Sequence, residues 1–309
     1  MSHPTLPAVR LTLPGTSANL GPGFDAVGLA FSMHLSVEAH AAPAFIITAT
    51  GRNADLCAAL ERNLILDTYR AVLTAHGKHI TPLHLTLHNE IPLGAGCGSS
   101  AAALLAGVAL ASHFGQLHLS DAAIIAEASR LEGHPDNVAA CWLGGFTVST
   151  QTDSAPGALP VIHTATFPGN PAWELILALQ PTSLATKEAR ALLPDHYSRA
   201  DAVFNIQRSA LLTAAFAQSR LDLLRTATQD RLHQPYRQHA CPLLKQLLPL
   251  AAEPEIAAVT LSGAGPSVLL FLAETTTFLA AETRLRALLA PEVELIPLRI
   301  AAGAQVVTL

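Results

Sequence analysis

No Asp, Glu, Lys or Arg occurs between Ile91 and Ser120, the longest uncharged stretch in the chain. A stretch of this length is either a membrane span or a loop and helix buried in a core. A span needs about 20 consecutive apolar residues, whereas the apolar run here extends only from Ala101 to Ala111 and is followed by His113. The stretch therefore predicts a buried helix in a protein that does not enter a membrane.

The composition supports a large hydrophobic core. Of the 309 residues, 50% are hydrophobic and 13% are charged, which excludes an intrinsically disordered chain. Because single cores stop growing at about 250–300 residues, this length favours two domains. The stretch 152–171 is rich in Pro, Gly, Ala and Ser and is the best candidate for the connection between them. We therefore expect domains at residues 1–160 and 161–309.

Charge and cysteine usage exclude several classes of function. The net charge is −5 and only 18 residues are basic, whereas nucleic-acid-binding domains carry a clustered surplus of Lys and Arg. The four cysteines form no C-x-x-C pair, which argues against a zinc site or a disulfide framework. The first ten residues have neither a basic start nor an apolar run, so the sequence predicts a cytoplasmic protein.

The order of strand and helix patterns predicts an α+β protein. Short alternating or β-branched runs predict strands at Val9–Leu13, Ala44–Ala49, Leu83–His88, Phe146–Thr150, Leu175–Leu179, Ala257–Leu261, Val268–Leu272 and Leu295–Ile300. Helical periodicity with start and stop signals predicts helices at Leu56–His76, Ala101–Phe114, Asp121–Leu131, Ala202–Thr226 and Thr277–Leu289. These elements are interleaved without a strict β-α repeat, which favours α+β over a doubly wound sheet.

A glycine-rich loop precedes the apolar helix. Gly94, Gly96 and Gly98 allow close approach of a bulky anion, and Ser99 and Ser100 carry hydroxyls at the start of the helix. A helix N-terminus supplies free N–H groups and a favourable dipole for phosphate. The loop is therefore either a phosphate cradle or a glycine-rich turn capped by a serine. It is not a Walker A loop, because no Gly-Lys-Ser/Thr sequence follows it and none of the three lysines lies near it.

Three further segments combine glycines with polar residues. Pro14–Gly28 is a loop after a strand that could surround a small polar ligand, or a surface turn. Leu261–Ser267 lies between two strands and by itself is a connecting turn. The third, Glu132–Gly145, contains the run Glu-Gly-His-Pro-Asp-Asn-Val-Ala and ends with two glycines.

Taken together, these four segments resemble the motifs of the GHMP kinases. Residues 92–101 are similar to the second motif, Pro-x-Gly-x-Gly-Leu-Gly-Ser-Ser-Ala, with Cys97 where the family prefers Leu or Met. Residues 14–25 resemble the first motif as it occurs in the homoserine kinases of that family, and residues 262–267 resemble the third. The segment that begins at Glu132 resembles the one that supplies an acidic metal ligand.

The resemblance implies a fold, a reaction and its reactants. The fold would be a two-domain α+β GHMP kinase fold, with an N-terminal α/β ATP-binding domain and a C-terminal ferredoxin-like α/β sandwich. The reaction would be ATP- and Mg²⁺-dependent phosphorylation of L-homoserine to O-phospho-L-homoserine in threonine biosynthesis, by a homodimer. Two alternatives stay open: a GHMP kinase for another small alcohol, and a non-catalytic ligand sensor, which could have lost Glu132 or Ser100; both are present.

The resemblance also implies a role for individual residues. ATP would contact Asn63, Pro92, Leu93, Gly94, Ala95, Gly96, Cys97, Gly98, Ser99, Ser100, Ala101 and Ala102. Mg²⁺ would be bound by Ser100 and Glu132. Homoserine would be bound by Asn19, Asp25, His134, Asn137, Arg190, Arg237 and Gly263, with Asp25 at its ammonium group and the two arginines at its carboxylate. Asn137 and Thr186 would orient the reacting groups.

A dedicated general base is harder to find. Mevalonate kinases have an Asp at the position of Asn137, and an amide cannot accept a proton. His134 has a suitable unperturbed pKa, but a structural role for it is open as well. Since the transition state of phosphoryl transfer is loose, the phosphate or water could take the proton late. We therefore expect catalysis without a carboxylate base.

Overall fold

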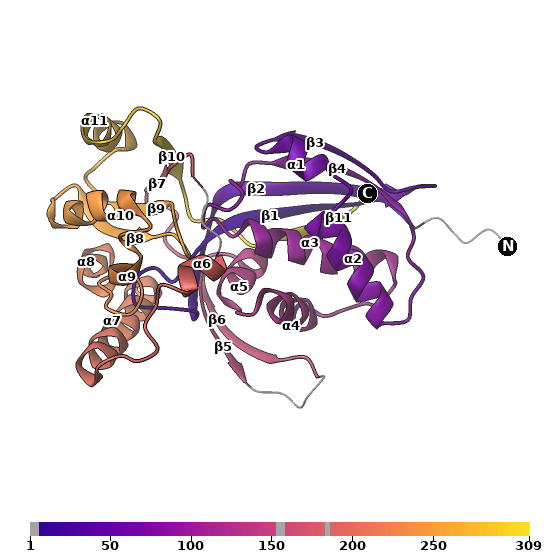
Figure 1. Ribbon diagram of the computed structural model, residues 1–309, viewed down its shortest axis with the longest axis horizontal. Coiled ribbons are helices and arrows are strands. Elements are labelled where there is room, and N and C mark those ends of the chain that lie inside the picture. Colours follow the sequence, from indigo (N-terminus) through magenta and orange to yellow (C-terminus); the bar gives the residue numbers. More distant parts are fainter. Residues whose placement is uncertain (1–5, 153–157, 183–185) are drawn as a thin grey trace.

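The computed structural model describes residues 6–152, 158–182 and 186–309, which form two β-sheets flanked by helices (Figure 1). In this part of the chain the first sheet has seven strands: β1 (Val9–Ala18), β2 (Val27–Ala41), β3 (Ile46–Gly51), β4 (Leu83–Asn89), β5 (Phe146–Thr152), β6 (Val161–Phe167) and β11 (Gln305–Thr308). The second has four: β7 (Leu175–Leu179), β8 (Ile256–Leu261), β9 (Val268–Leu272) and β10 (Glu294–Leu298). The predicted α+β class is confirmed.

The strands are ordered β11-β1-β2-β4-β3 in the first sheet, with β5 paired to β2 and to β6, and β10-β7-β9-β8 in the second. All pairs are antiparallel except β3 with β4. Strand β4 alternates between buried and more exposed side chains, as expected where one face is covered. Strands β7, β8 and β9 are buried at every position, which explains why their sequences are apolar throughout except for Thr260 in β8.

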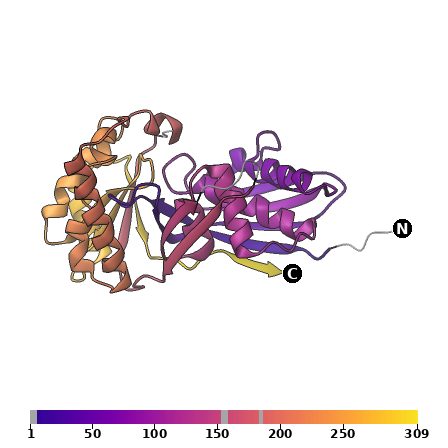
Figure 2. The same ribbon diagram turned by 90° about the horizontal axis from the view of Figure 1, so that it is seen from below.

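Helices α2 to α5 lie together on one face of the first sheet (Figures 1 and 2). The bounds of the helices on this side are α1 (Ala54–Ala58), α2 (Leu64–Ala75), α3 (Ser99–Phe114), α4 (Asp121–Glu132) and α5 (Asp136–Leu143). Helix α3 is the predicted apolar helix, and it packs between α2 and α4. Within the described ranges, no helix combines the length and the apolarity needed to cross a bilayer.

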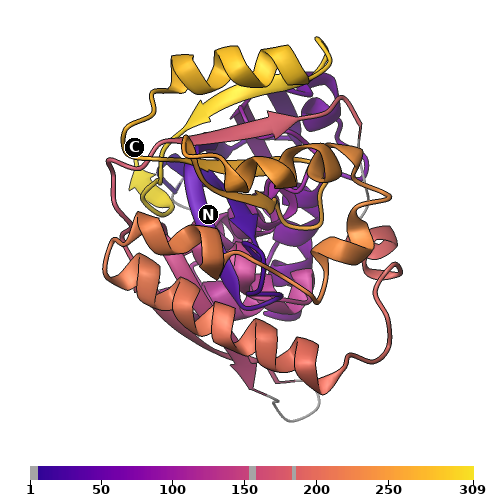
Figure 3. The same cartoon turned by 90° about the vertical axis from the view of Figure 1, so that its left-hand side faces the viewer.

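The helices of the second half other than α6 cover the outer side of the second sheet, and α6 lies beside the first half (Figures 1 and 3). The helices of the second half are α6 (Thr186–Arg190), α7 (Arg199–Ala217), α8 (Leu224–Ala227), α9 (Gln234–Arg237), α10 (Pro242–Leu247) and α11 (Phe278–Leu288), with 3₁₀ turns at Leu221–Leu223 and Leu248–Ala252. Side-chain caps fix several starts: Ser120 caps α4, Ser198 caps α7 and Thr277 caps α11.

Several elements differ from the sequence prediction for local physical reasons. The predicted helix Leu56–His76 is two helices, because the Asn63 side chain accepts a hydrogen bond from Leu66 N and starts α2. The predicted helix Ala202–Thr226 ends at Ala217, and Ser219 then adopts a left-handed backbone with φ of 53°. The elements that were not predicted are strands β2, β6 and β11 and helices α5, α6, α9 and α10.

One of these elements lies in the stretch that was expected to connect two domains. Strand β6 follows residue 160 but pairs with β5, and the C-terminal strand β11 pairs with β1. The first sheet is therefore built from both ends of the chain. A division into domains at residue 160 stays a prediction.

An aromatic cluster joins the two sheets. Phe216 of α7 stacks on Phe146 of β5 with ring centroids 4.0 Å apart, and it also meets Trp173 and Phe271 edge-on. These residues belong to a single hydrophobic core that contains side chains from both sheets. This aromatic cluster, which we call the aromatic joint, fixes how the loops of the two halves face one another.

Candidate active site

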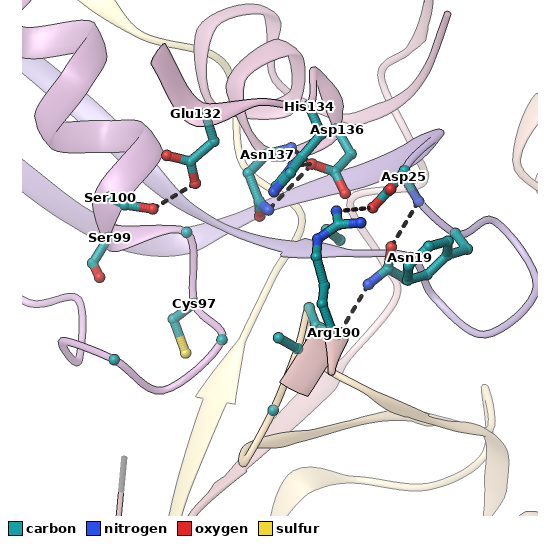
Figure 4. A pocket seen from close by; sticks show the side chains of 18 of the residues that line it. Asn19, Asp25, Cys97, Ser99, Ser100, Glu132, His134, Asp136, Asn137 and Arg190 are labelled. Carbon is teal, nitrogen blue, oxygen red and sulfur yellow. Dashed lines mark hydrogen bonds and ion pairs between the residues drawn. The ribbon is translucent and has the colours of Figure 1, made fainter. Parts of the chain in front are cut away.

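A cavity of about 240 Å³ lies where loops from both halves of the chain meet (Figure 4). All four glycine-containing segments singled out in the sequence contribute to its wall. Its lining residues are Ala18, Asn19, Phe24, Asp25, Gly94, Gly96, Cys97, Gly98, Ser99, Ser100, Glu132, His134, Asp136, Asn137, Arg190, Arg237, Gly263, Ala264 and Gly265.

The glycine-rich loop runs directly into α3, and no side chain caps that helix. Gly98 immediately before the helix has a left-handed φ of 69°, and a Cβ atom there would lie 1.8 Å from Thr16 Oγ1. Only glycine therefore fits this position without displacing β1. The result is a loop with open backbone N–H groups and two serine hydroxyls at a helix N-terminus, which is an anion-binding arrangement.

Hydrogen bonds connect the glycine-rich loop to the loops Pro14–Gly28 and Leu261–Ser267. The backbone N–H of Thr16 donates to Cys97 O at 3.0 Å. The Ser262 hydroxyl donates to Gly96 O at 2.7 Å. Segments that lie at opposite ends of the sequence are thus fixed as one wall of the cavity.

Ser100 and Glu132 face each other at one end of the cavity. The Ser100 hydroxyl donates to Glu132 Oε1 at 2.6 Å. Burial raises the pKa of the Glu132 carboxyl, and the hydrogen bond from Ser100 opposes this shift only in part. One hydroxyl and one carboxylate are the oxygen donors that suit Mg²⁺, which needs only one or two protein ligands when phosphates are present. The residues predicted as metal ligands therefore fit that ion.

The opposite end of the cavity carries two arginines and an aspartate. Arg190 Nη2 donates to Asp25 Oδ1 at 2.6 Å, and both side chains are partly exposed. Arg237 is 1% exposed and forms no ion pair with any carboxylate in the described residues. Both guanidinium groups lie beside the Phe24 ring, at 5.3 and 5.4 Å from its centroid. Asp136 lies close to this end as well, since its carboxylate, the Asp25 carboxylate and the His134 ring come within 4.8 Å of one another. The two guanidinium groups therefore face two aspartates.

Asn19 supports the aspartate and the third loop at once. Its side-chain amide donates to Gly263 O at 2.9 Å, and its Oδ1 accepts from the Asp25 backbone N–H at 3.0 Å. These two bonds fix the Asp25 backbone against the loop of Gly263, and they leave one of the two Asn19 amide hydrogens. A direct contact of Asn19 with a ligand stays a prediction.

The fourth segment brings His134, Asp136 and Asn137 to the cavity wall. His134 Nδ1 lies 2.5 Å from Asp136 Oδ1, and the Asn137 amide oxygen accepts from Thr16 Oγ1 at 2.7 Å. Burial alone would lower the pKa of His134, but the hydrogen bond to Asp136 and the nearby carboxylates outweigh it and raise that pKa. Asn137 is held as a hydrogen-bonding group with no capacity to accept a proton.

A second, more apolar cavity of about 460 Å³ adjoins the first and shares Ser99 and Ser100 with it. Leu56, Ile65 and Leu93 are among its walls. Asn63 also lines it, but its side chain is engaged in starting α2 and in donating to the backbone of the preceding turn. Asn63 therefore acts as the N-cap of α2, and it contributes to this cavity by fixing where that helix begins.

The structure brings most of the predicted site residues together. Of the predicted nucleotide contacts, Pro92, Ala95, Ala101 and Ala102 are buried in the loop and helix and line neither cavity. Helix α6 begins at Thr186, whose side chain lies outside the described part of the structure. Phe24 and Asp136 were missed as site residues. Both stand inside the motif segments, but residue type alone does not indicate which motif residues face a ligand.

Comparison with known proteins agrees with the motifs. A family model described as "GHMP kinases N terminal domain" matches residues 63–145. A homoserine kinase of Solibacter usitatus is 45% identical over 85% of this chain and 84% of its own length. A homoserine kinase of Thermus thermophilus is 41% identical over 84% of this chain and 85% of its own length.

Solved structures give the same fold. The homoserine kinase of Cytophaga hutchinsonii has a TM-score of 0.77 with this structure and covers 99% of both chains, at 21% identity. The mevalonate kinase of L. major has a TM-score of 0.69 at 13% identity, which shows that the fold extends across related kinases. The predicted GHMP kinase fold is confirmed. Because relatives above 40% identity cover most of the chain, it follows that this chain belongs to the homoserine kinases of the GHMP kinase family.

Proposed function

We propose that the protein transfers the γ-phosphoryl group of ATP to the side-chain hydroxyl of L-homoserine, forming O-phospho-L-homoserine for threonine biosynthesis. The observation that carries the proposal is the cavity itself, which has an anion-binding glycine loop on one side and both Asp25 and two arginines on the other. Such a pairing suits a phosphate donor together with an amino-acid acceptor. The curated relatives bear the same activity in their names.

The nucleotide would occupy both cavities. The glycine-rich loop and the uncapped N-terminus of α3 offer N–H groups to the phosphates. The apolar cavity beyond Ser99 and Ser100 offers a place for adenine. Ser100 and Glu132 would hold Mg²⁺, which neutralises the charge of the phosphates when it is bound.

Homoserine would replace an ion pair that the protein forms with itself. In the free cavity Arg190 and Asp25 neutralise each other. The ammonium group of the substrate would take the place of Arg190 at Asp25, and its carboxylate would take Arg190 and the buried Arg237. Every charge then has a partner in the complex. A compound that lacks either the ammonium or the carboxylate would leave one of these charges unpaired, which is costly in a partly buried site.

Asn137 and Thr186 would orient the acceptor hydroxyl and the γ-phosphate. The Asn137 amide oxygen accepts from Thr16 and one of its amide hydrogens goes to Asp136, so the other amide hydrogen is what it offers to the reactants. Because no carboxylate base is proposed, the proton of the hydroxyl would leave late in the reaction, to the phosphate or to water.

A coupled ADP-release assay with Mg²⁺ tests the proposal, with homoserine, threonine and mevalonate offered as acceptors. We expect homoserine to be phosphorylated with by far the highest kcat/KM. Preference for mevalonate would indicate a GHMP kinase for another alcohol. Binding of ATP and homoserine by calorimetry without ADP release above background would indicate a ligand sensor.

A further inference from the structure

Asp136 is a buried carboxylate to which no role has yet been given. It is the first residue of α5, and it is 1% exposed. A single oxygen, Oδ1, is shared by three nitrogen atoms: His134 Nδ1 at 2.5 Å, the Asn137 backbone N at 2.7 Å and Asn137 Nδ2 at 3.3 Å (Figure 4). One carboxylate oxygen therefore holds two side chains of the cavity wall.

Asn137 is held from its other side as well. Its Oδ1 accepts from the Thr16 hydroxyl at 2.7 Å, which fixes which way the amide faces. The backbone N–H of Thr16 in turn donates to Cys97 O in the glycine-rich loop. A continuous series of hydrogen bonds thus leads from the phosphate loop through Asn137 to Asp136 and His134. One Asn137 amide hydrogen remains for the cavity.

We propose that Asp136 is a positioning residue for phosphoryl transfer, which fixes His134 and Asn137 in the orientation that meets the acceptor end of the substrate. This inference rests on the proposed function. Asp136 acts through its two neighbours and not by contact with the reacting atoms. Misplacement of an orienting group by about 1 Å can cost about 100-fold in rate, so a shared anchor for two such groups has a large effect on turnover.

Three substitutions separate the position of the oxygen from the charge of the carboxylate. Asp136→Asn keeps an acceptor oxygen at the place of Oδ1 and loses the charge. Asp136→Glu keeps the charge and displaces the oxygen by one methylene. Asp136→Ala removes both. The second oxygen of Asp136 accepts no hydrogen bond from the described residues, so the amide nitrogen of an asparagine has room in its place.

Asp121→Ala is the matched control. Asp121 is likewise the first residue of its helix, α4, and its carboxylate accepts from the Trp142 ring nitrogen at 3.0 Å. It lines neither of the two site cavities. This variant therefore removes a carboxylate from the start of a helix but leaves the contacts of His134 and Asn137 intact.

The expected result is a lower kcat with an almost unchanged KM for ATP. We expect Asp136→Ala and Asp136→Glu to lower kcat with homoserine about 100-fold, Asp136→Asn to lose less than about 10-fold, and the KM for ATP to change less than about twofold in each. Asp121→Ala keeps the wild-type constants. Circular dichroism and thermal unfolding of each variant establish that it is folded.

Other outcomes overturn the inference. An Asp136→Ala variant with wild-type kcat would do so, as would a loss that Asp121→Ala shares. If Asp136→Glu retained turnover and Asp136→Asn lost it, charge and not position would be responsible; this comparison decides the matter even if Asp136→Ala does not fold. Absence of homoserine phosphorylation in the wild type would instead contradict the proposed function, so the two failures are distinguishable.

Discussion

At the residue scale, Arg237 shows how burial prepares the cavity for an anion. Its guanidinium is 1% exposed, and its hydrogen bonds go to Ala189 O, Gly263 O and the His233 ring. Burial lowers its pKa, and the nearby Arg190 lowers it further. A guanidinium nevertheless stays charged, so the fold carries a buried cation whose desolvation is offset when a ligand carboxylate arrives.

Asp25 gives the first prediction at this scale. Its backbone φ of 56° is a conformation that asparagine adopts readily, so Asp25→Asn removes the charge and keeps the loop. We expect the KM for homoserine to rise about 10- to 100-fold, because a hydrogen bond to a charged group contributes about 1.5–3 kcal/mol. The KM for ATP should change little. Steady-state kinetics with each substrate varied in turn measures both.

Asp222→Asn is the control for Asp25→Asn, since Asp222 also pairs with an arginine, Arg220, but on the exposed surface. Its constants should match those of the wild type. Equal increases of both KM values in Asp25→Asn would show that Asp25 does not bind the ammonium group.

His233 gives a prediction for stability and pH. It is fully buried, with Nε2 2.8 Å from Gly21 O and Nδ1 3.1 Å from the Arg237 guanidinium. Burial lowers the pKa of His233, although the neighbouring Asp230 opposes this. In the neutral ring Nε2–H donates and Nδ1 accepts, and protonation would place two donors face to face at Nδ1.

A histidine whose pKa is lower in the folded than in the unfolded state stabilises the fold above the unfolded value of about 6.5, and this stabilisation is lost as the pH falls. We expect His233 to lower the free energy of unfolding in urea between pH 7.5 and 5.5, by at most about 1.4 kcal/mol per pH unit. His134, whose pKa is raised, contributes with the opposite sign and is common to the wild type and the variant. The variant His233→Gln should show a shallower dependence. Parallel curves for the two proteins would contradict the assignment.

At the element scale, the N-terminus of α3 depends on a glycine that is held against β1. Gly98 has a φ of 69°, and an added Cβ would collide with the Thr16 hydroxyl. Gly77, which follows α2, has a similar φ of 62° but nothing within 4 Å of an added Cβ. A substitution at either position strains the backbone, but only at Gly98 would the new side chain also collide with Thr16.

We expect Gly77→Ala to cost about 1 kcal/mol of stability, from the left-handed backbone, and to leave the kinetics unchanged. Gly98→Ala should lose more stability and raise the KM for ATP, because β1 and the phosphate loop must move apart. Urea unfolding and steady-state kinetics on both variants check this. Similar kinetics for the two variants would show that the contact with Thr16 does not matter for nucleotide binding.

At the scale of the whole molecule, the aromatic joint around Phe216 makes the two sheets share one core. The two tryptophans report on different places: Trp142 lies in α5 beside the first sheet, and Trp173 lies at the joint. We expect fluorescence and circular dichroism to show a single coincident unfolding transition for the wild type. Separate transitions would show that the two halves unfold independently.

Phe216→Ala should lower the free energy of unfolding by about 3–5 kcal/mol, the usual cost of removing a large buried aromatic side chain. Leu279→Ala is the control, because Leu279 is 71% exposed and its removal should cost less than about 0.5 kcal/mol. A small effect of Phe216→Ala would mean that the joint contributes little to holding the sheets together.

The sequence by itself determined the family, the α+β class and the elements with the strongest local patterns. Helix α3 and strands β7 and β9 were predicted nearly residue for residue, because continuous apolar runs bounded by glycines or polar residues leave few alternatives. The motifs also indicated which segments form the cavity. Local patterns were less informative where burial changes along one strand, as in β2, or where a short edge strand carries little apolar sequence, as in β11.

The tertiary structure alone decided how the site residues meet. Asp25 and Arg190 are separated by 165 residues and yet form an ion pair. Asp136 became the shared partner of His134 and Asn137, and Asn63 became a helix cap, although the sequence assigned neither role. Propensity and periodicity report the backbone of one segment at a time. Contacts between distant segments depend on how a shared core and three hydrogen-bonded loops pack, and only the folded chain fixes that.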